Sequence, residues 1–279
     1  MTIAIALRTG SAVIFAADSK VTVPGVVGID ANGQPQWVDQ TYDNATKVVH
    51  DRSMTLMAMV AGYATIGQIA ATDFISTKSL DFGDSIDEGE QDGSIKRLVD
   101  EMFDRKRAYW QNTKVPPGDW PGPTGLLAAP LPKENLPRVW RADLEGESPR
   151  VSRILTEPGI RLEGTYAEVF SLLYGYHFDV VGGSCAELNI TKEAMLEAFG
   201  KMKVLRPIDK LNLWAMPVQD AIDMAVFLAT VQVEMDRFLP GTPACGGPID
   251  VMVLQMAPRA GIVAYPGKSP HHPRVSRLD

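Results

Sequence analysis

Thr2 and Asp18, near the start of the chain, have residue types and a spacing that suit nucleophilic catalysis. An initiator Met is removed when the next side chain is small, and Thr meets that condition, so we expect Met1 to be removed. Thr2 would then carry a free α-amine beside its own hydroxyl, which places a base and a nucleophile on one residue. Asp18 follows sixteen residues later, in the run Ala16-Ala-Asp-Ser-Lys20.

The elements that must position these residues begin with a hairpin. Residues 2–8 and 12–18 are short, apolar and β-prone, and the turn residues Thr9-Gly10-Ser11 separate them. The segment 24–44 contains Gly and Pro and is predicted to be a long loop or arm. Downstream, the patterns predict strands at 47–50, 54–61, 124–129, 138–144, 150–155 and 249–256, helices at 66–75, 94–111, 166–174, after Thr191 and from Met216, and an acidic loop at 82–92.

The order of these elements indicates the fold class. Strands are followed by two helices, then by more strands, more helices and a final strand. Because a regular βαβ alternation is missing, a doubly wound parallel sheet is disfavoured. Two antiparallel sheets packed face to face with helices outside fit better. No linker divides the chain, so we expect one domain over residues 1–279.

Composition excludes several classes of protein. The chain has 279 residues, of which 45% are hydrophobic and 22% are charged, as in an ordinary globular protein. Its net charge of -7 argues against nucleic acid as a partner. Cys185 and Cys245 have no metal-ligand spacing, so neither a metal site nor a disulfide framework is expected. No secretory signal is visible, and the apolar stretch 221–233 is too short to span a bilayer, so the prediction is a cytoplasmic protein with no membrane partner.

Four features in the same order resemble the proteasome β-subunit type of N-terminal nucleophile (Ntn) hydrolase. They are Thr2 at the start, the run ending at Lys20, Lys47 in Ala45-Thr-Lys-Val-Val, and Gly62 at the end of a strand. The run Cys245-Gly-Gly-Pro-Ile-Asp250 is similar to the family's Ser-Gly-Gly turn. The longer link between Asp18 and Lys47 suggests a divergent, bacterial proteasome-like branch.

The resemblance implies a fold and a set of roles. The fold would be α+β, a four-layer α-β-β-α sandwich of two antiparallel sheets flanked by helices. Thr2 would be the nucleophile, and the ammonium of Lys47 would lower the pKa of its hydroxyl. Asp18 would hold Lys47 in place, and the backbone N–H of Gly62 would belong to an oxyanion hole. No cofactor and no metal are implied.

The sequence departs from the family pattern near the terminal amine. The family has a Ser in a Gly-Ser-Gly-Ser turn, for which Thr165 is the candidate here and Gly182-Gly-Ser-Cys185 is an alternative register. Thr242 stands where the family has an Asp, and Cys245 stands at the Ser of Ser-Gly-Gly. Asp236 or another acid could substitute for the missing carboxylate.

Segments 24–44 and 175–215 look inserted relative to the family, and 258–279 looks like a C-terminal extension that could cover a partner's surface.

The resemblance implies a threonine-type peptidase or amide hydrolase that acts on a peptide or protein and assembles into a homo-oligomeric ring. The sequence does not indicate whether an ATP-dependent unfoldase takes part. Two alternatives remain: an Ntn-fold acyl transferase or small-amide hydrolase, and a catalytically silent assembly subunit.

Overall fold

The computed structural model describes residues 2–29, 35–80, 88–111, 123–131, 138–201, 206–241, 243–256 and 261–268. The strands are β1 (Ile3–Arg8), β2 (Ala12–Asp18), β3 (Val21–Ile29), β4 (Pro35–Tyr42), β5 (Val48–His50), β6 (Leu56–Gly62), β7 (Thr65–Ile66), β8 (Ile69–Ala70), β9 (Pro123–Pro130), β10 (Val139–Asp143), β11 (Arg150–Leu155), β12 (Gly159–Gly164), β13 (Ile249–Gln255) and β14 (Gly261–Lys268). The helices are α1 (Ala71–Thr77), α2 (Glu88–Trp110), α3 (Ala167–Tyr174), α4 (Phe178–Leu188), α5 (Lys192–Lys201), the 3-10 helix η2 (Pro207–Lys210) and α6 (Val218–Asp236).

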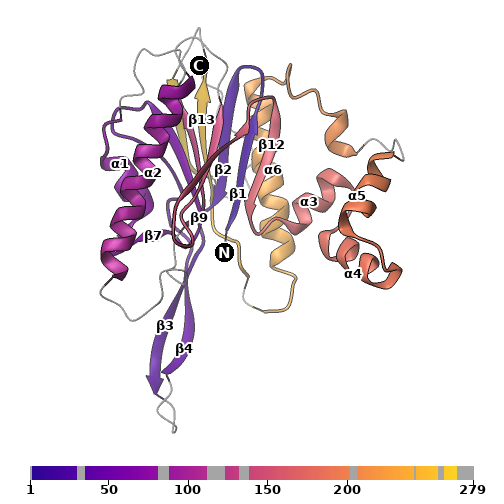
Figure 1. Cartoon of the computed structure of the whole chain (residues 1–279), viewed down its shortest axis with the longest axis horizontal. Helices are drawn as coiled ribbons and strands as arrows, with labels where there is room; N and C mark the ends of the chain where they lie inside the picture. The colour runs from indigo at the N-terminus through magenta and orange to yellow at the C-terminus, as the bar shows by residue number, and fades with distance from the viewer. Residues whose placement is uncertain are drawn as a thin grey trace.

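Two five-stranded antiparallel sheets form the body of the protein. The first has the strand order β12-β1-β2-β13-β14, and the second has the order β11-β10-β9-β6-β5. Long helix α6 contacts the first sheet, α1 contacts the second, and Figure 1 shows α1 and α2 on the opposite side of the molecule from α6. The prediction of an α+β chain with two antiparallel sheets is therefore confirmed.

Three clusters of buried apolar side chains fill the spaces between the layers. One lies between α6 and the first sheet, and a second lies between α1, α2 and the second sheet. The third joins residues of both sheets, with Ala6 and Phe15 from the first and Met57 and Leu127 from the second. Because strand side chains alternate between faces, the near-continuous apolar runs of β1 and β2 fit strands that are covered on both sides.

The β1–β2 hairpin forms as the sequence predicts. Thr9 Oγ1 accepts hydrogen bonds from the backbone N–H of Ser11, at 3.2 Å, and of Ala12, at 3.0 Å. A threonine that bonds to backbone groups two and three residues later closes a tight turn. The hairpin places Thr2, just before β1, and Asp18, at the end of β2, at the same end of the sheet.

Several elements differ from the expectations. Within 24–44, which was expected to be a loop or arm, β3 and β4 pair as a hairpin that projects from the body (Figure 1). Part of the expected helix at 66–75 is instead the small β7–β8 ladder, with only α1 helical after it. Helix α2 begins at Glu88, inside the expected acidic loop.

Three further elements were not foreseen. Strand β12 pairs with β1, and α4 lies in the segment 175–215. Strand β14 belongs to the expected C-terminal extension, yet it pairs with β13 and forms an edge of the first sheet. Residues 269–279 of that extension lie outside the described residues.

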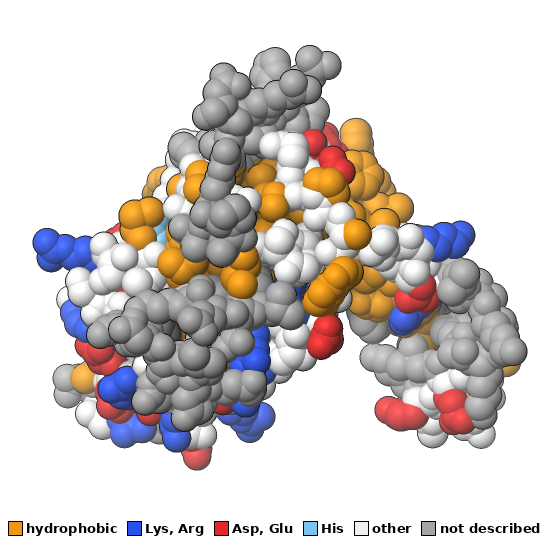
Figure 2. All heavy atoms as spheres, turned by 90° about the horizontal axis from the view of Figure 1, so that it is seen from above, with side chains coloured by type: hydrophobic (Ala, Val, Ile, Leu, Met, Phe, Trp, Pro, Cys, Tyr) orange, Lys and Arg blue, Asp and Glu red, His pale blue; other side chains and the backbone are white. Residues whose placement is uncertain are grey.

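Seen from above, hydrophobic side chains gather over the middle of the molecule, and charged side chains lie mostly toward its edges (Figure 2). Among the described helices, none is both long and apolar enough to cross a membrane.

Burial in the layer between the sheets should stabilise the fold. Phe15 is fully buried there, so Phe15→Ala should lower the free energy of unfolding by about 3–5 kcal/mol because it leaves a cavity. The same truncation at Phe238, which is 78% exposed, should cost much less. Urea denaturation of both variants tests this, and equal losses would contradict the assignment of the inter-sheet layer as the core.

Candidate functional site

Thr2, Asp18 and Lys47 meet at one end of the first sheet. Thr2 precedes β1, Asp18 ends β2, and Lys47 precedes β5 of the second sheet, so the site bridges both sheets. All three side chains are shielded from solvent, with exposures of 2% for Thr2, 0% for Asp18 and 5% for Lys47. Charged groups that are buried to this degree require close partners.

The carboxylate of Asp18 is held by three donors. Its Oδ1 accepts hydrogen bonds from Lys47 Nζ at 2.8 Å and from the backbone N–H of Ile3 at 3.1 Å. Its Oδ2 accepts one from the backbone N–H of Gly246 at 2.9 Å. Three bonds of this kind fix the carboxylate in one orientation. Asp18 thereby joins β1, the β2 end and the loop before β13.

Lys47 is the link between Asp18 and the hydroxyl of Thr2. Its ammonium group donates hydrogen bonds to Thr2 Oγ1, Asp18 Oδ1 and the backbone carbonyl of Lys20. An ammonium has three N–H donors, so this arrangement satisfies all of them. Burial lowers the pKa of Lys47, and the nearby charge and hydrogen bond of Asp18 partly offset that fall. Among the described groups, Asp18 is therefore the largest influence that favours the protonated form of Lys47.

Thr165 also lies beside Thr2. Its backbone N–H donates a 2.7 Å hydrogen bond to the carbonyl oxygen of Thr2. Its Oγ1 is buried and has no hydrogen-bond partner within the described part of the chain. Gly164 makes this approach feasible: its φ is +81°, and a Cβ there would lie 1.9 Å from the Thr2 carbonyl oxygen. Only a residue without a side chain fits at this position.

Cys245 closes the site from the loop before β13. Its thiol is buried, and its backbone N–H donates a 2.8 Å hydrogen bond to Asp236 Oδ2 at the end of α6. Burial, with smaller contributions from the charges of Asp18 and Asp236, raises the pKa of the Cys245 thiol to about 12. The thiol is therefore protonated at neutral pH and is a poor nucleophile. Asp236 fixes the turn whose next N–H, that of Gly246, binds Asp18.

The loops around the site are locked together by Ser19. Its Oγ donates a 2.5 Å hydrogen bond to the carbonyl of Asp43, and its backbone N–H donates one to Pro248 at 3.0 Å. Gly247 has a φ of +73°, and a Cβ there would lie 2.5 Å from both Ser19 Oγ and the Asp43 carbonyl. Ser19 was not expected to matter, although it follows Asp18 directly in the sequence.

The other expected residues are placed as follows. Gly62 is exposed at the end of β6 with a φ of +83°, and no described hydrogen bond joins it to Thr2. The alternative register Gly182-Gly-Ser-Cys185 lies within α4, whereas Thr165 bonds directly to Thr2. Thr242 lies outside the described residues. Gly164 and Asp236 complete the site. The position of Gly164 directly before Thr165 could have indicated its role from the sequence.

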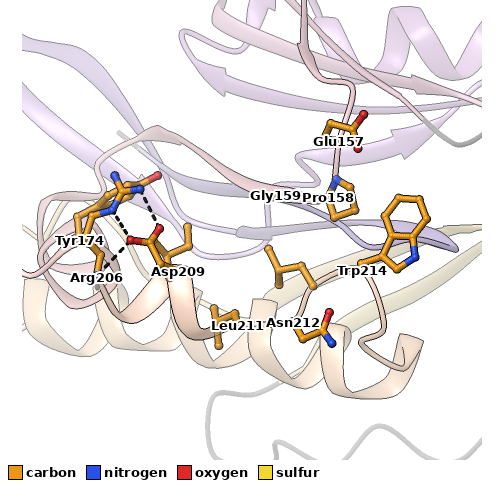
Figure 3. A pocket seen from close by; sticks show the side chains of 11 residues that line it. Glu157, Pro158, Gly159, Tyr174, Arg206, Asp209, Leu211, Asn212 and Trp214 are labelled. Atoms are coloured by element: carbon orange, nitrogen blue, oxygen red, sulfur yellow. Dashed lines mark hydrogen bonds and ion pairs between the residues drawn. The ribbon is translucent and has the colours of Figure 1, made fainter. Parts of the chain in front are cut away.

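A separate cavity of about 590 Å³ lies away from this site. Its lining residues include Tyr174, Glu157 and the exposed Trp214. Arg206 and Asp209 form an ion pair in its wall (Figure 3). It also includes Gly159, which pairs with Arg8 at the opposite end of β1 from Thr2. The cavity is therefore not part of the Thr2 site.

In the described part of the chain, no group of three or more His, Cys, Asp or Glu side chains could hold a metal ion. No protein-family model matches the sequence, and no curated protein matches it either.

Replacement of Gly164 should destabilise the protein more than backbone strain alone explains, because the new side chain would collide with Thr2. Gly164→Ala would force a Cβ into the Thr2 carbonyl, whereas Gly146 has a similar φ of +76° and open space around it. We expect Gly146→Ala to cost about 1–2 kcal/mol in unfolding free energy and Gly164→Ala to cost clearly more. Urea denaturation gives both values, and equal costs would show that the close approach to Thr2 is relaxed in solution.

The charge of Lys47 should appear in the pH dependence of stability. Its folded-state pKa lies below the 10.5 of a free lysine, so between these two values the unfolded state binds more protons and stability rises with pH. Asp18→Asn removes the charge that offsets burial, so the rise should begin at a lower pH than in the wild type. Urea denaturation from neutrality toward pH 10.5 measures this.

The control for that measurement is the double variant Asp18→Asn/Lys47→Met, in which the added pH dependence should disappear. Identical profiles for the wild type and Asp18→Asn would mean that Asp18 does not set the protonation of Lys47.

Proposed function

We propose that this protein is a threonine-type peptidase or amide hydrolase, with Thr2 as the nucleophile once the residue before it has been removed. The observation that carries the proposal is the buried chain of contacts from Asp18 to Lys47 Nζ and from Lys47 Nζ to Thr2 Oγ1. A nucleophile, a cation that lowers its pKa and a carboxylate that holds the cation are the parts that such a site needs.

The first step forms an ester on Thr2. Its Oγ attacks the substrate carbonyl carbon, and the hydroxyl proton passes to the free α-amine of Thr2, directly or through a water. The C–N bond of the amide then breaks, and the leaving amine takes the proton. In the second step a water attacks the ester, which releases the acid and restores the Thr2 hydroxyl.

Lys47 acts through its charge. The ammonium beside Thr2 Oγ1 stabilises the alkoxide form of the hydroxyl more than the neutral form, which lowers the hydroxyl pKa. The effect is strong because water is excluded from all three side chains. We assign Asp18 a positioning role, since it contacts Lys47 and two backbone N–H groups.

We also assign roles to Thr165, Asp236 and Gly62. The buried, unpartnered Oγ1 of Thr165 is suited to bind the α-amine of Thr2 when that amine is free. Asp236 replaces the carboxylate that is missing at Thr242, and it acts on the Cys245 turn through a backbone N–H. Gly62 remains our candidate oxyanion donor, a role worth about 3–4 kcal/mol in the transition state.

The fold supports a place among Ntn hydrolases, next to the proteasome β-subunit type. The support is a pair of antiparallel sheets with helices outside and the nucleophile at the start of a central strand. We further propose assembly into a homo-oligomer through the helical layers. Large apolar side chains remain exposed on and just after α6, namely Phe227, Met235, Phe238 and Leu239.

An electrophile that reacts with an N-terminal threonine should label Thr2 alone. The protein is prepared so that its chain begins at Thr2 and is treated with a peptide epoxyketone, which needs both the hydroxyl and the free amine. Intact mass and peptide mapping should find one adduct, at Thr2. Thr2→Ala should give none, and Lys47→Ala should slow labelling by about 10²–10³-fold because the oxyanion-like charge loses its cation.

Two controls accompany this experiment. Thr9→Ala removes a buried threonine hydroxyl from the far end of β1 and should leave labelling unchanged. Protein with a residue retained before Thr2 should not react. Labelling that persists in Thr2→Ala would overturn the assignment of the nucleophile.

A further inference from the structure

Arg8 is a charged residue in a position that the fold otherwise fills with apolar side chains. Along β1, Ile3, Ile5 and Leu7 belong to the cluster under α6, whereas Ala4 and Ala6 belong to the cluster between the sheets. Alternation along the strand therefore directs Arg8 toward the space between the two sheets. It lies at the end of β1 next to the β1–β2 turn, the opposite end from Thr2.

The guanidinium of Arg8 is buried and unsatisfied. The residue has 0% exposure, and its Nε, Nη1 and Nη2 atoms have no hydrogen-bond partner among the described residues. Arginine remains protonated in proteins, so a full positive charge with five N–H donors is enclosed here. Buried charges are normally paired, because an unpaired one loses its hydration without compensation. This site therefore lacks an anion.

The described charges around Arg8 supply no hydrogen-bonded anion. Burial lowers the pKa of Arg8, the carboxylate of Glu157 raises it, and the positive charge of Arg138 lowers it. Glu157 thus acts through space, but it accepts no hydrogen bond from Arg8. Among the described residues, Glu157 and Arg138 are the charged groups that act on the pKa of Arg8.

A small residue lies across from Arg8 in the first sheet. The cross-strand partner of Arg8 is Gly159, which adds no side chain beside the guanidinium. Glu157 and Gly159 also line the cavity of Figure 3, where the lining residues Ile208, Leu211 and Leu213 pack with the cluster under α6.

We propose that Arg8 forms a binding site for a small oxyanion, a carboxylate or a phosphate, at the end of the sheets remote from Thr2. A planar guanidinium can donate two parallel hydrogen bonds to two oxygens of such a group, and all three nitrogens of Arg8 lack a described partner. The site takes no part in the chemistry proposed for Thr2, so either proposal can fail without the other.

Anion-dependent stability of the full chain tests this site. Melting temperature is measured in inorganic phosphate or acetate against chloride at equal ionic strength. A bound oxyanion should raise it by roughly 2–5 °C for each tenfold increase in anion concentration above the dissociation constant. Arg8→Met should abolish the dependence. A response to phosphate alone identifies a phosphate site, and a response to acetate alone identifies a carboxylate site.

The control is a second buried cation that does have a partner. Lys106 is also fully buried, and its ammonium donates to the Leu144 carbonyl, so Lys106→Met should lose stability yet keep the anion response. Because phosphate also stabilises proteins by exclusion from their surface, the difference between wild type and Arg8→Met is the quantity that decides.

If Arg8→Met does not fold, phosphate and acetate binding to the wild type and to Arg8→Lys is measured by calorimetric titration. Weaker binding by Arg8→Lys, which cannot bind two oxygens in parallel, supports the site. No binding of either anion by the wild type, or an unchanged response in Arg8→Met, overturns it.

Discussion

The buried ion pair between Lys47 and Asp18 is the interaction on which the candidate site depends. Two charges taken out of water are stable only when their remaining donors and acceptors are also satisfied. Here the lysine binds the Thr2 hydroxyl and the Lys20 carbonyl, and the aspartate binds two backbone N–H groups. The same contacts that offset desolvation therefore fix the position of Thr2.

Close backbone approaches make this pairing possible. Glycine at 164 lets the chain after β12 reach the Thr2 carbonyl, and glycine at 247 lets the loop before β13 reach Ser19 and Asp43. Asp236 then anchors that loop through the N–H of Cys245. Segments far apart in the sequence converge in this way at one end of the first sheet.

The buried cations near the two ends of β1 differ in their hydrogen bonding. At the Thr2 end, Lys47 has a partner for every N–H. At the other end, Arg8 has none, although both residues are enclosed by the protein. An unpaired buried charge destabilises a fold, so this contrast within the described part of one sheet fits the oxyanion that we propose at the Arg8 end.

The sequence by itself determined the β1–β2 hairpin, most strands and the residue types of the site, because period-two apolar runs, turn residues and helical spacing are local signals. The order of Thr2, Asp18 and Lys47 along the chain resembled the pattern of Ntn hydrolases. It missed the start of α2, where Asp92 in an acidic run accepts a 2.6 Å hydrogen bond from the buried Trp140. It also missed β12 and β14, which exist because they pair with β1 and β13. Only the tertiary structure decided which side chains meet, since those contacts depend on strand register between residues far apart along the chain.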